Sequence, residues 1–431
     1  MPRDRRIVIT GVGPVASVGI GKDAFWKGLL AGRQNIREEE VNIGGEEWGK
    51  FPFHAVEPFS LPELGVDPDS LEWIRDWQHG ELTRDLQYLI AAVQLALNDS
   101  GLDYRAGNNR IGLVVAHENY NLTHFLSQIS DHAYRMLAET SPQPSKKAFY
   151  DSLYQQCVKA GYDVQPFMVL FHLAKVFNIH NYSLFVCTAC ASGLYGLESA
   201  SQMIKSGQND LVLVTAADHP DIYKYIWFQQ LGIYAADGII RPFCRDSKGL
   251  VFGAGGAALL LEEYRHAKKR GAHIYGEYLG GGFSLESWQV TVPQVGSDSY
   301  QTAMREALGR SGVTKDDVDF LCPHGVGSHV IDYYEAKAIT DVFGKNPVQP
   351  LLTTFKPYVG HNLGGSALLE ALILLLCLDK QTVLPTLNQS DPNPEYKISL
   401  LKEAVKKKVS VAMKTCCAFA GFNGAAVFRR I

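Results

Sequence analysis

Short apolar runs alternate with amphipathic stretches along the first half of the chain. The runs of strand length are residues 6–10, 110–116, 182–186 and 210–215. The stretches in which apolar residues recur every three or four positions are residues 23–30, 85–100 and 191–206. These periods predict strands that alternate with helices, and buried sheets covered by helices are typical of an α/β protein.

The second half of the chain repeats this rhythm. Its strand-like runs are residues 257–262, 318–322, 409–411 and 425–428. Its helix-like stretches are residues 299–310, 331–343 and 366–378. We therefore predict two similar α/β halves, residues 1–264 and residues 265–431, although the halves share too few letters to establish a repeat.

Two segments lack a clear period. Residues 130–162 are polar and aromatic, with the breakers SPQPS at 141–145, and they are predicted to form a surface insertion with short helices. Residues 38–64 are similarly irregular and are predicted to be loop.

Composition excludes several classes of protein. Among 431 residues, 46% are hydrophobic and 20% are charged, and the formal net charge of -4 gives no strong field for nucleic acid. The longest apolar stretch, residues 367–378, contains Glu370 and is too short to span a bilayer. The opening MPRDRRIVITGVG lacks the apolar run of a signal peptide, and the eight scattered cysteines favour reduced thiols. We expect a cytoplasmic protein without a membrane span or a nucleic-acid partner.

A candidate nucleophile lies in the sequence CTACASG, whose second cysteine is Cys190. A predicted strand gives way to a predicted helix at this point. A thiol at a helix N-terminus lies near unpaired amides, which favour the thiolate, and small neighbours would allow a substrate to approach closely. A single cysteine is more often a buried apolar residue, so the nucleophile needs support from other residues.

Two histidines in glycine-rich segments supply that support: His324 in PHGVGS and His361 in KPYVGHNLGG. One such histidine is usually structural. Two of them, together with a candidate nucleophile, favour hydrogen-bond donors or acceptors at one site. Lys356, just before His361, could supply positive charge there.

Two other motifs point to different chemistry. Cys187 and Cys190 form C-x-x-C, which is typical of a redox dithiol or of half a zinc site. The adjacent Cys416 and Cys417 would make a poor second pair of zinc ligands. GVGPVA, residues 11–16, fits a dinucleotide-binding pattern, but its proline removes an amide from the turn that would face the phosphates. We predict neither a metal nor a nucleotide cofactor.

In order along nearly the whole chain, several segments resemble the β-ketoacyl-acyl carrier protein synthase II-like condensing enzymes of the thiolase superfamily. They are RIVITGVG, CTACASGLYGLESA, RPF with the later GLVFGAGGAALLLEE, PHGVGSHVIDYYEAKAI, KPYVGHNLGG and AFAGFNGAAVF. The resemblance implies a thiolase-like fold, in which two similar α/β halves form a five-layered α-β-α-β-α core. It also implies a 3-oxoacyl-[acyl-carrier-protein] synthase, which joins an acyl chain to malonyl-acyl carrier protein by decarboxylative Claisen condensation in fatty-acid or polyketide-type biosynthesis.

The resemblance assigns a role to each matching catalytic residue. Cys190 would take the acyl chain as a thioester. His324 and His361 would assist decarboxylation of the malonyl thioester and stabilise the enolate, while Lys356 and Glu335 would organise the site.

The resemblance also implies which residues contact substrate. Phe419 matches a gating phenylalanine, and the backbone amides of Phe419 and Cys190 would form the oxyanion hole. Val326 and Ser328 stand where the family has two threonines that hold the pantetheine arm. Ala418 begins the closing loop and is a further candidate contact.

The chain departs from the family at several positions. Cys244 and Ala254 turn the usual RPFD and GEGAG into RPFC and GAGGA, and Phe422 is bulky for its place in the closing loop. HENYNLTHF, residues 117–125, replaces a glycine-rich stretch. Together with the aromatic insertion, these changes indicate a reshaped acyl pocket or interface in a specialised pathway, or else an ordinary substrate after neutral drift.

The expected partner is an acyl carrier protein, whose phosphopantetheine carries the substrates, and no further cofactor is implied. A homodimer is implied, and a heterodimer with a second ketosynthase-like subunit is the alternative. In that alternative the chain would work with, or set chain length for, the other subunit, although such partners usually lack the cysteine. A thiolase or a coenzyme A-dependent acyltransferase, with Cys416 or Cys417 as a second thiol, is a further alternative.

Overall fold

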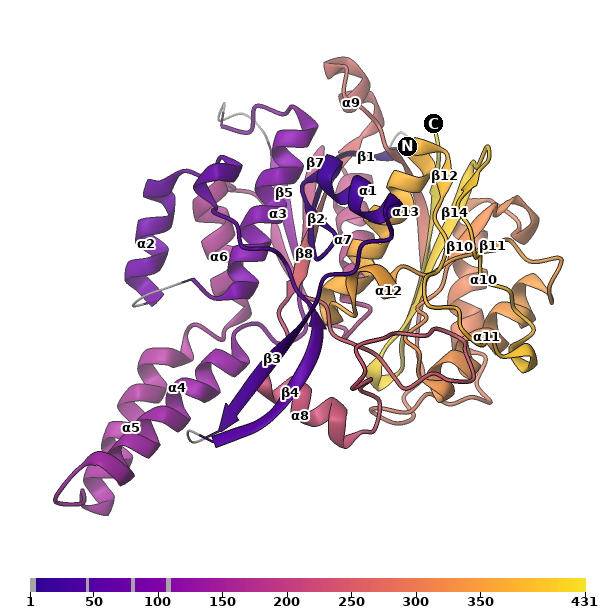
Figure 1. Cartoon of the computed structure of the whole chain (residues 1–431). Helices are drawn as coiled ribbons and strands as arrows, with labels where there is room; N and C mark the ends of the chain where they lie inside the picture. Colours follow the sequence, from indigo (N-terminus) through magenta and orange to yellow (C-terminus); the bar gives the residue numbers. More distant parts are fainter. Residues whose placement is uncertain (1–4, 44–45, 79–81, 106–109) are drawn as a thin grey trace.

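Strands from both halves of the chain join in one mixed sheet in the computed structural model, which describes residues 5–43, 46–78, 82–105 and 110–431 (Figure 1). In spatial order the strands are β11 (Leu351–Leu352), β10 (Phe320–Cys322), β14 (Val411–Cys417), β15 (Phe422–Arg429), β9 (Gly276–Leu285), β1 (Ile7–Ala16), β8 (Gly255–Glu263), β7 (Leu211–Asp218), β5 (Ile111–Ala116) and β6 (Ser183–Val186). The short β2 (Gly19–Ile20) pairs with β1 beside this order.

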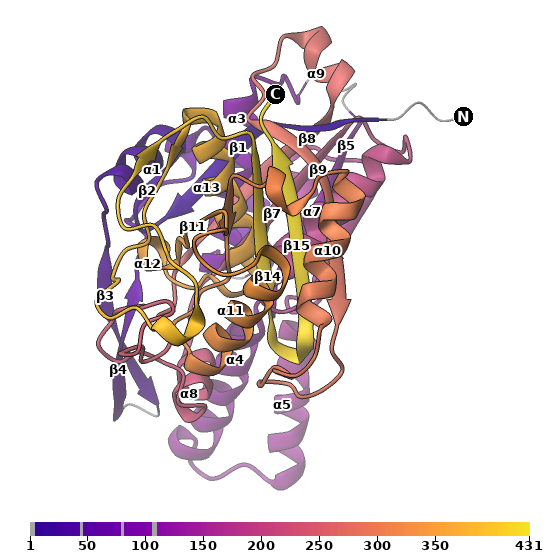
Figure 2. The same ribbon diagram turned by 90° about the vertical axis from the view of Figure 1, so that its right-hand side faces the viewer.

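The sheet has two parts, with helices between them and outside them. β1 pairs with β8 along its whole length but with β9 only through residues 7–9, so the two parts share one corner. From that corner, α7 (Ser192–Lys205) and α13 (Ser366–Lys380) pack against strands of both parts. On the outside, α3 (Arg84–Ser100) covers β1, β7 and β8, and α10 (Ser299–Ser311) covers β9 and β15 (Figure 2). This is the five-layered core that we expected.

The central helix α13 is apolar on every side. All of its residues from 366 to 378 are buried, as expected for a helix that is enclosed by sheets and helices rather than exposed on one face. Glu370 is the one charged residue among these buried positions, and its carboxylate lies inside the apolar core.

The predicted helices are present with ends that differ by a few residues. Beside those already named they include α1 (Lys22–Leu30) and α11 (His329–Phe343). Helices that the apolar pattern did not predict are α2 (Pro68–Gln78), α6 (Pro166–Phe177), α8 (Ile222–Gln230), α9 (Tyr264–Arg270) and the short α12 (Lys356–Val359). The glycine-rich β9 was also missed. In the described ranges, none of the helices combines the length and the apolar character needed to cross a bilayer.

The prediction of loop for residues 38–64 was wrong over most of that segment. A hairpin of β3 (Ile36–Ile43) and β4 (Glu46–His54) occupies it. Its charged residues concealed the strands, but Phe51 is buried and stacks on Tyr225 with ring centroids 4.7 Å apart. Tertiary packing therefore outweighs the low strand propensity of the segment.

The insertion at residues 130–162 is more regular than predicted. α4 (Leu122–Tyr134) and α5 (Lys146–Gly161) form a helical hairpin that projects from the body of the molecule, as both ribbon views show. The helices are 13 and 16 residues long, so the expectation of short helices was too conservative.

The GVGPVA segment lies inside β1 and forms no phosphate-binding turn. The strand was expected to end at its first glycine. Instead it continues to Ala16, and its glycines allow α3 to lie against it: a Cβ on Gly13 would be 1.9 Å from the carbonyl oxygen of Ala92. Close helix–strand packing therefore accounts for the motif.

Replacing Gly13 by alanine is expected to destabilise the protein, because the new Cβ would overlap the backbone of α3. Overpacking of this kind costs about 1–3 kcal/mol or more. The matched control is Gly309→Ala in α10, where no described atom outside its own helix lies within 4 Å of the new Cβ and alanine favours the helix by about 0.5–1 kcal/mol. Urea unfolding measures both variants, and equal midpoints would contradict the packing argument.

Candidate active site

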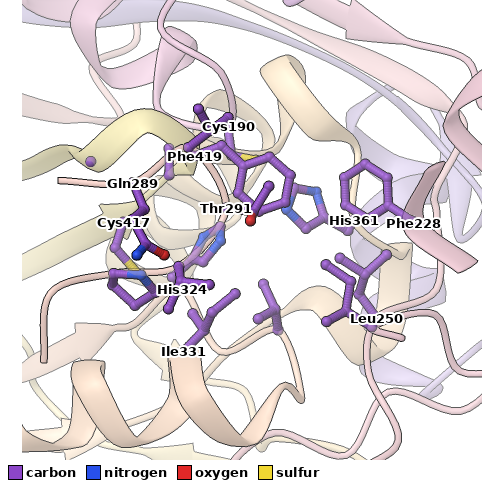
Figure 3. A pocket seen from close by; sticks show the side chains of 17 residues that line it. Cys190, Phe228, Leu250, Gln289, Thr291, His324, Ile331, His361, Cys417 and Phe419 are labelled. Atoms are coloured by element: carbon purple, nitrogen blue, oxygen red, sulfur yellow. The ribbon is translucent and has the colours of Figure 1, made fainter. Parts of the chain in front are cut away.

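Cys190, His324 and His361 meet in one pocket, although they are far apart in the sequence. The Sγ atom of Cys190 and a ring nitrogen of each histidine all lie within 4.8 Å of one another. The two rings are nearly perpendicular, with centroids 5.3 Å apart. Figure 3 shows the three side chains on the wall of the pocket, together with Phe228 and Phe419.

A tight turn between β6 and α7 places Cys190. Ala189 adopts a positive φ of 50°, and the Ser192 hydroxyl accepts a hydrogen bond from the amide of Thr188 at 2.8 Å and donates one to the Ala189 carbonyl at 2.6 Å. The small residues in CTACASG are therefore required by the turn. They bring the thiol to the start of α7, as predicted.

The Cys190 thiol is protonated in the resting site. Burial raises its pKa well above the usual 9.0, the nearby Glu118 carboxylate raises it further, and Lys356 opposes the shift. The sequence suggested that the helix N-terminus would favour the thiolate, but burial outweighs that effect. Nucleophilic attack must therefore remove a proton.

The hydrogen bonds of the two imidazoles define their tautomers. The amide of Leu363 donates to Nδ1 of His361 at 2.9 Å, and the Lys356 ammonium lies 3.2 Å from Nδ1 of His324. Both neighbours are donors, so each Nδ1 accepts and each Nε2 carries the hydrogen. Burial, followed by the charge of Lys356, holds the pKa of both histidines well below 6.5, so both rings are neutral donors.

Two lysines and one glutamate lie behind the histidines. Lys356 contacts Glu370 at 2.7 Å and donates to the carbonyl of His324 at 2.7 Å. Lys414 contacts the other carboxylate oxygen of Glu370 at 2.5 Å and donates to the carbonyl of Pro323 at 3.0 Å. The three charged side chains are at most 1% exposed. The two ammonium groups both act on the imidazoles, because each lowers the pKa of His324 and of His361.

Glu335 holds the loop that carries His324. Its carboxylate accepts hydrogen bonds at 2.7 Å from the amides of His324 and Gly325 and from the hydroxyl of Tyr300. Glu335 therefore touches the backbone of the histidine loop and acts through it, as expected for an organising residue.

The predicted substrate contacts divide into two groups. Val326, Ala418 and Phe419 line the pocket. Ser328 is buried at the start of α11 and is not among the residues that line it. The ring of Phe419 stacks on Phe228 with centroids 5.5 Å apart, and the free space in the pocket is about 30 Å³.

Several residues of the site were missed by sequence reasoning. They are Lys414, Glu370, Tyr300, Asp332 and Asn362. Asp332 accepts hydrogen bonds from the amides of Phe243 and Gly327, and the amide group of Asn362 donates to the backbone of β7 and β8. Only Glu370 left a signal in the sequence, a charge inside an apolar helix.

The positions that depart from the family lie in different surroundings. The ring of Phe422 packs against Tyr195 at 5.9 Å, and Phe422 is not among the residues that line the pocket. Its bulk therefore does not reshape this pocket. Cys244 and Ala254 are fully buried.

Thiols and imidazoles are common metal ligands, so the site was compared with a zinc site. Cys190, His324 and His361 have the donor types of a zinc site and are the group with that spacing found in the described residues. Because Nδ1 of each histidine is already engaged, each ring offers an Nε2–H group rather than a lone pair. N–H donors suit an oxyanion better than a metal cation. Cys187 donates to the carbonyl of Glu118 at 3.0 Å, and Cys416 to that of Cys190 at 3.4 Å.

Comparison with known proteins identifies relatives along the whole chain. Residues 4–267 match the family described as "Beta-ketoacyl synthase, N-terminal domain", and residues 275–390 match "Beta-ketoacyl synthase, C-terminal domain". The 3-oxoacyl-[acyl-carrier-protein] synthase 2 of Vibrio cholerae is 29% identical, with 99% of each chain covered. Nodulation protein E of Rhizobium meliloti is 27% identical, with 99% of this chain and 100% of that protein covered.

Solved structures share the fold. The ishigamide ketosynthase/chain length factor gives a TM-score of 0.84 at 25% identity, covering 99% of this chain and 100% of that one. A β-ketoacyl synthase from Burkholderia phymatum gives 0.82 at 24% identity with the same coverage. The predicted thiolase-like fold is confirmed, and with matches to both domains of the family this chain belongs to the β-ketoacyl synthases.

Proposed function

We propose that the protein is a condensing enzyme that joins a Cys190-bound acyl group to a malonyl thioester with loss of carbon dioxide. The observation that carries this proposal is a buried thiol within 4.8 Å of two neutral imidazoles that offer N–H groups. The relative from Vibrio cholerae is named for the same reaction on acyl carrier protein.

In the first half-reaction the Cys190 sulfur attacks the thioester carbonyl of the acyl donor. The thiol loses its proton, the tetrahedral intermediate carries an oxyanion, and the carrier leaves as a thiol that takes up a proton. The backbone amides of Cys190 and Phe419 form the oxyanion hole, which lowers such barriers by about 3 kcal/mol. The product is a covalent acyl-enzyme with the carrier site vacated.

In the second half-reaction the malonyl thioester loses carbon dioxide, and the electron pair moves onto its carbonyl oxygen. His324 and His361 donate their Nε2 hydrogens to this enolate oxygen. The enolate carbon then attacks the acyl carbonyl on Cys190, and the sulfur leaves. The ammonium groups of Lys356 and Lys414 lie behind the imidazoles, where their charge stabilises the developing negative charge.

Substrate entry requires Phe419 to move. The free space of about 30 Å³ is far below the several hundred Å³ that a thioester with its pantetheine arm needs, and Phe419 fills the pocket against Phe228. In the open state Val326, Ser328 and Ala418 border the arm. No metal or other cofactor takes part in these steps.

An acyl carrier protein is the partner in this proposal, the cytoplasm is the compartment, and residues 1–264 and 265–431 are the two halves. We favour a homodimer, with a heterodimer as the alternative because the ishigamide protein is described as a ketosynthase/chain length factor.

The purified chain, given both thioesters, should form 3-oxoacyl product by itself. Activity that appears only with a second ketosynthase-like subunit would favour the heterodimer.

Cys190→Ala should abolish the acyl-enzyme, because it removes the sulfur that forms the thioester. Intact-mass measurement after incubation with acyl thioesters detects the adduct. Cys187→Ala is the matched control, because Cys187 lies in the same turn but is exposed and outside the pocket. Label that persists in Cys190→Ala, or that disappears in Cys187→Ala, would refute the assignment.

Alkylation of Cys190 by iodoacetamide should accelerate with pH. Burial raises the pKa of this thiol above 9.0, so the reactive thiolate is a minor species below that pH, and its share grows about tenfold per pH unit. Rates measured between pH 7 and 9 on the Cys187→Ser background should rise without a plateau. A plateau below pH 8 would show that the helix terminus, rather than burial, sets the pKa.

Lys414→Met should slow decarboxylation by about tenfold while acyl loading of Cys190 stays within about twofold. The change removes one of the two positive charges that act on the imidazoles but leaves Glu370 paired with Lys356. The pKa of His324 and His361 should rise, since Lys414 lowers both, and NMR titration reads this out. Lys380→Met, at the half-exposed end of α13, is the control. Unchanged imidazole pKa values would leave Lys414 with a packing role only.

A further inference from the structure

Residues 286–294 follow β9 and form a strap at the mouth of the Cys190 pocket. Among the described residues that line this pocket, the exposed ones are Gln289, Val290 and Val292, and all three belong to the strap. Cys190 and the two histidines of the site are buried. The pocket therefore meets solvent beside the strap, and a thioester carried on a long arm has to pass the strap to reach the sulfur.

Hydrogen bonds hold the strap against the loop that carries the gating phenylalanine. The Glu286 carboxylate accepts a hydrogen bond from the amide of Gln294 at 2.9 Å, so one side chain joins the two ends of the strap. The amide of Glu286 donates to the carbonyl of Gly421 at 3.0 Å, and the amide of Ala420 donates to the carbonyl of Val290 at 2.6 Å. These bonds fix the position of the strap beside the gate.

Gln289 and Thr291 give the strap polar side chains at the pocket. Figure 3 shows both among the side chains that surround the pocket, and Thr291 is partly buried. Apart from the thiols and the two histidines, no other described residue of the lining has a side chain that forms hydrogen bonds. Neither Gln289 nor Thr291 has a side-chain hydrogen bond to another described residue. Both side chains are therefore available to a ligand in the pocket.

The loop after His324 does not supply such groups to the pocket. Val326 lines it with an apolar side chain, and Ser328 is not among the residues that line it. The pantetheine arm of the substrates carries two amide groups, and a polar group that is buried without a hydrogen bond weakens binding. The strap is thus the part of the described wall whose side chains can pair with these amides.

We propose that Gln289 and Thr291 hold the pantetheine arm by hydrogen bonds to its amide groups, in place of the two threonines that the family has after the first histidine. This inference rests on the proposed condensing function. A carboxamide and a hydroxyl each offer a donor and an acceptor, as an amide ligand requires. They carry no charge, so they suit the neutral arm better than the carboxylate of the malonyl group.

The test measures acyl transfer to Cys190 of the full-length protein by intact mass. One acyl group is supplied on pantetheine, which has two amides, and on butanethiol, which has none. Because the two thiols differ as leaving groups, each variant is compared with the unchanged protein on the same donor.

Thr291→Val keeps the shape of the side chain but removes the hydroxyl, and Gln289→Leu removes the carboxamide. Each should reduce loading from a subsaturating pantetheine donor by about fivefold, as expected for the loss of one hydrogen bond. The change should appear in the half-saturating concentration, while the saturating rate and loading from butanethiol stay within about twofold. Thr291→Ser, which retains a hydroxyl, should restore loading.

Gln294→Leu is the matched control. Gln294 is an exposed residue of the same strap and is not among the residues that line the pocket. The exchange should leave loading from both donors unchanged, which separates the loss of a contact with the arm from a change in the strap itself.

The outcomes separate this inference from the function beneath it. If Thr291→Val and Gln289→Leu slow both donors equally, the side chains act on the strap or the chemistry, and the proposal falls. If both variants load from pantetheine as fast as the unchanged protein, the arm is held elsewhere and the proposal also falls. The condensing function stands in either case. If no thioester loads Cys190 of the unchanged protein, the proposed function fails and this inference fails with it.

Discussion

The carboxylate of Glu370 is the buried charge on which the site depends. It lies in the middle of α13, a helix otherwise enclosed by apolar contacts, and both of its oxygens contact lysines. A buried ammonium without a partner costs several kcal/mol, so the contacts with Glu370 are what make the burial of Lys356 and Lys414 tolerable. The apolar core that encloses the three groups also keeps water from weakening their interaction.

This ion cluster determines the state of the histidines. Lys356 directs an N–H toward Nδ1 of His324 and holds the carbonyl of the same residue, so it fixes both the tautomer and the loop. Burial keeps both rings neutral, and the charges of Lys356 and Lys414 reinforce this, because protonating the rings would add charge of the same sign in a medium of low dielectric. Lys356 thus fixes the N–H donor of His324, the amide of Leu363 fixes that of His361, and the two lysines give a favourable potential for an enolate.

The sequence predicted those parts of the fold and site that depend on local pattern. The strand before Cys190, the glycine-flanked histidine loops and the apolar α13 all follow from short-range periodicity and turn chemistry. Lys414 could not be predicted, because its partner Glu370 is distant in sequence and only the packing of α13 against β14 brings them together. The hairpin of β3 and β4 was missed for a related reason, since its strands are stabilised by aromatic packing against α8 rather than by their own composition.

Two departures from the family pattern have unequal consequences for specificity. Phe422 appeared to offer bulk to the acyl pocket, yet its ring packs on Tyr195 and leaves the pocket lining unchanged. Residues 117–121 matter more, because the carbonyl of Glu118 accepts a hydrogen bond from Cys187 in the turn of the nucleophile at 3.0 Å, and the Glu118 carboxyl raises the pKa of Cys190. A glycine at position 118 would lack this carboxyl, so the departure in this loop acts on the nucleophile rather than on the lining of the pocket.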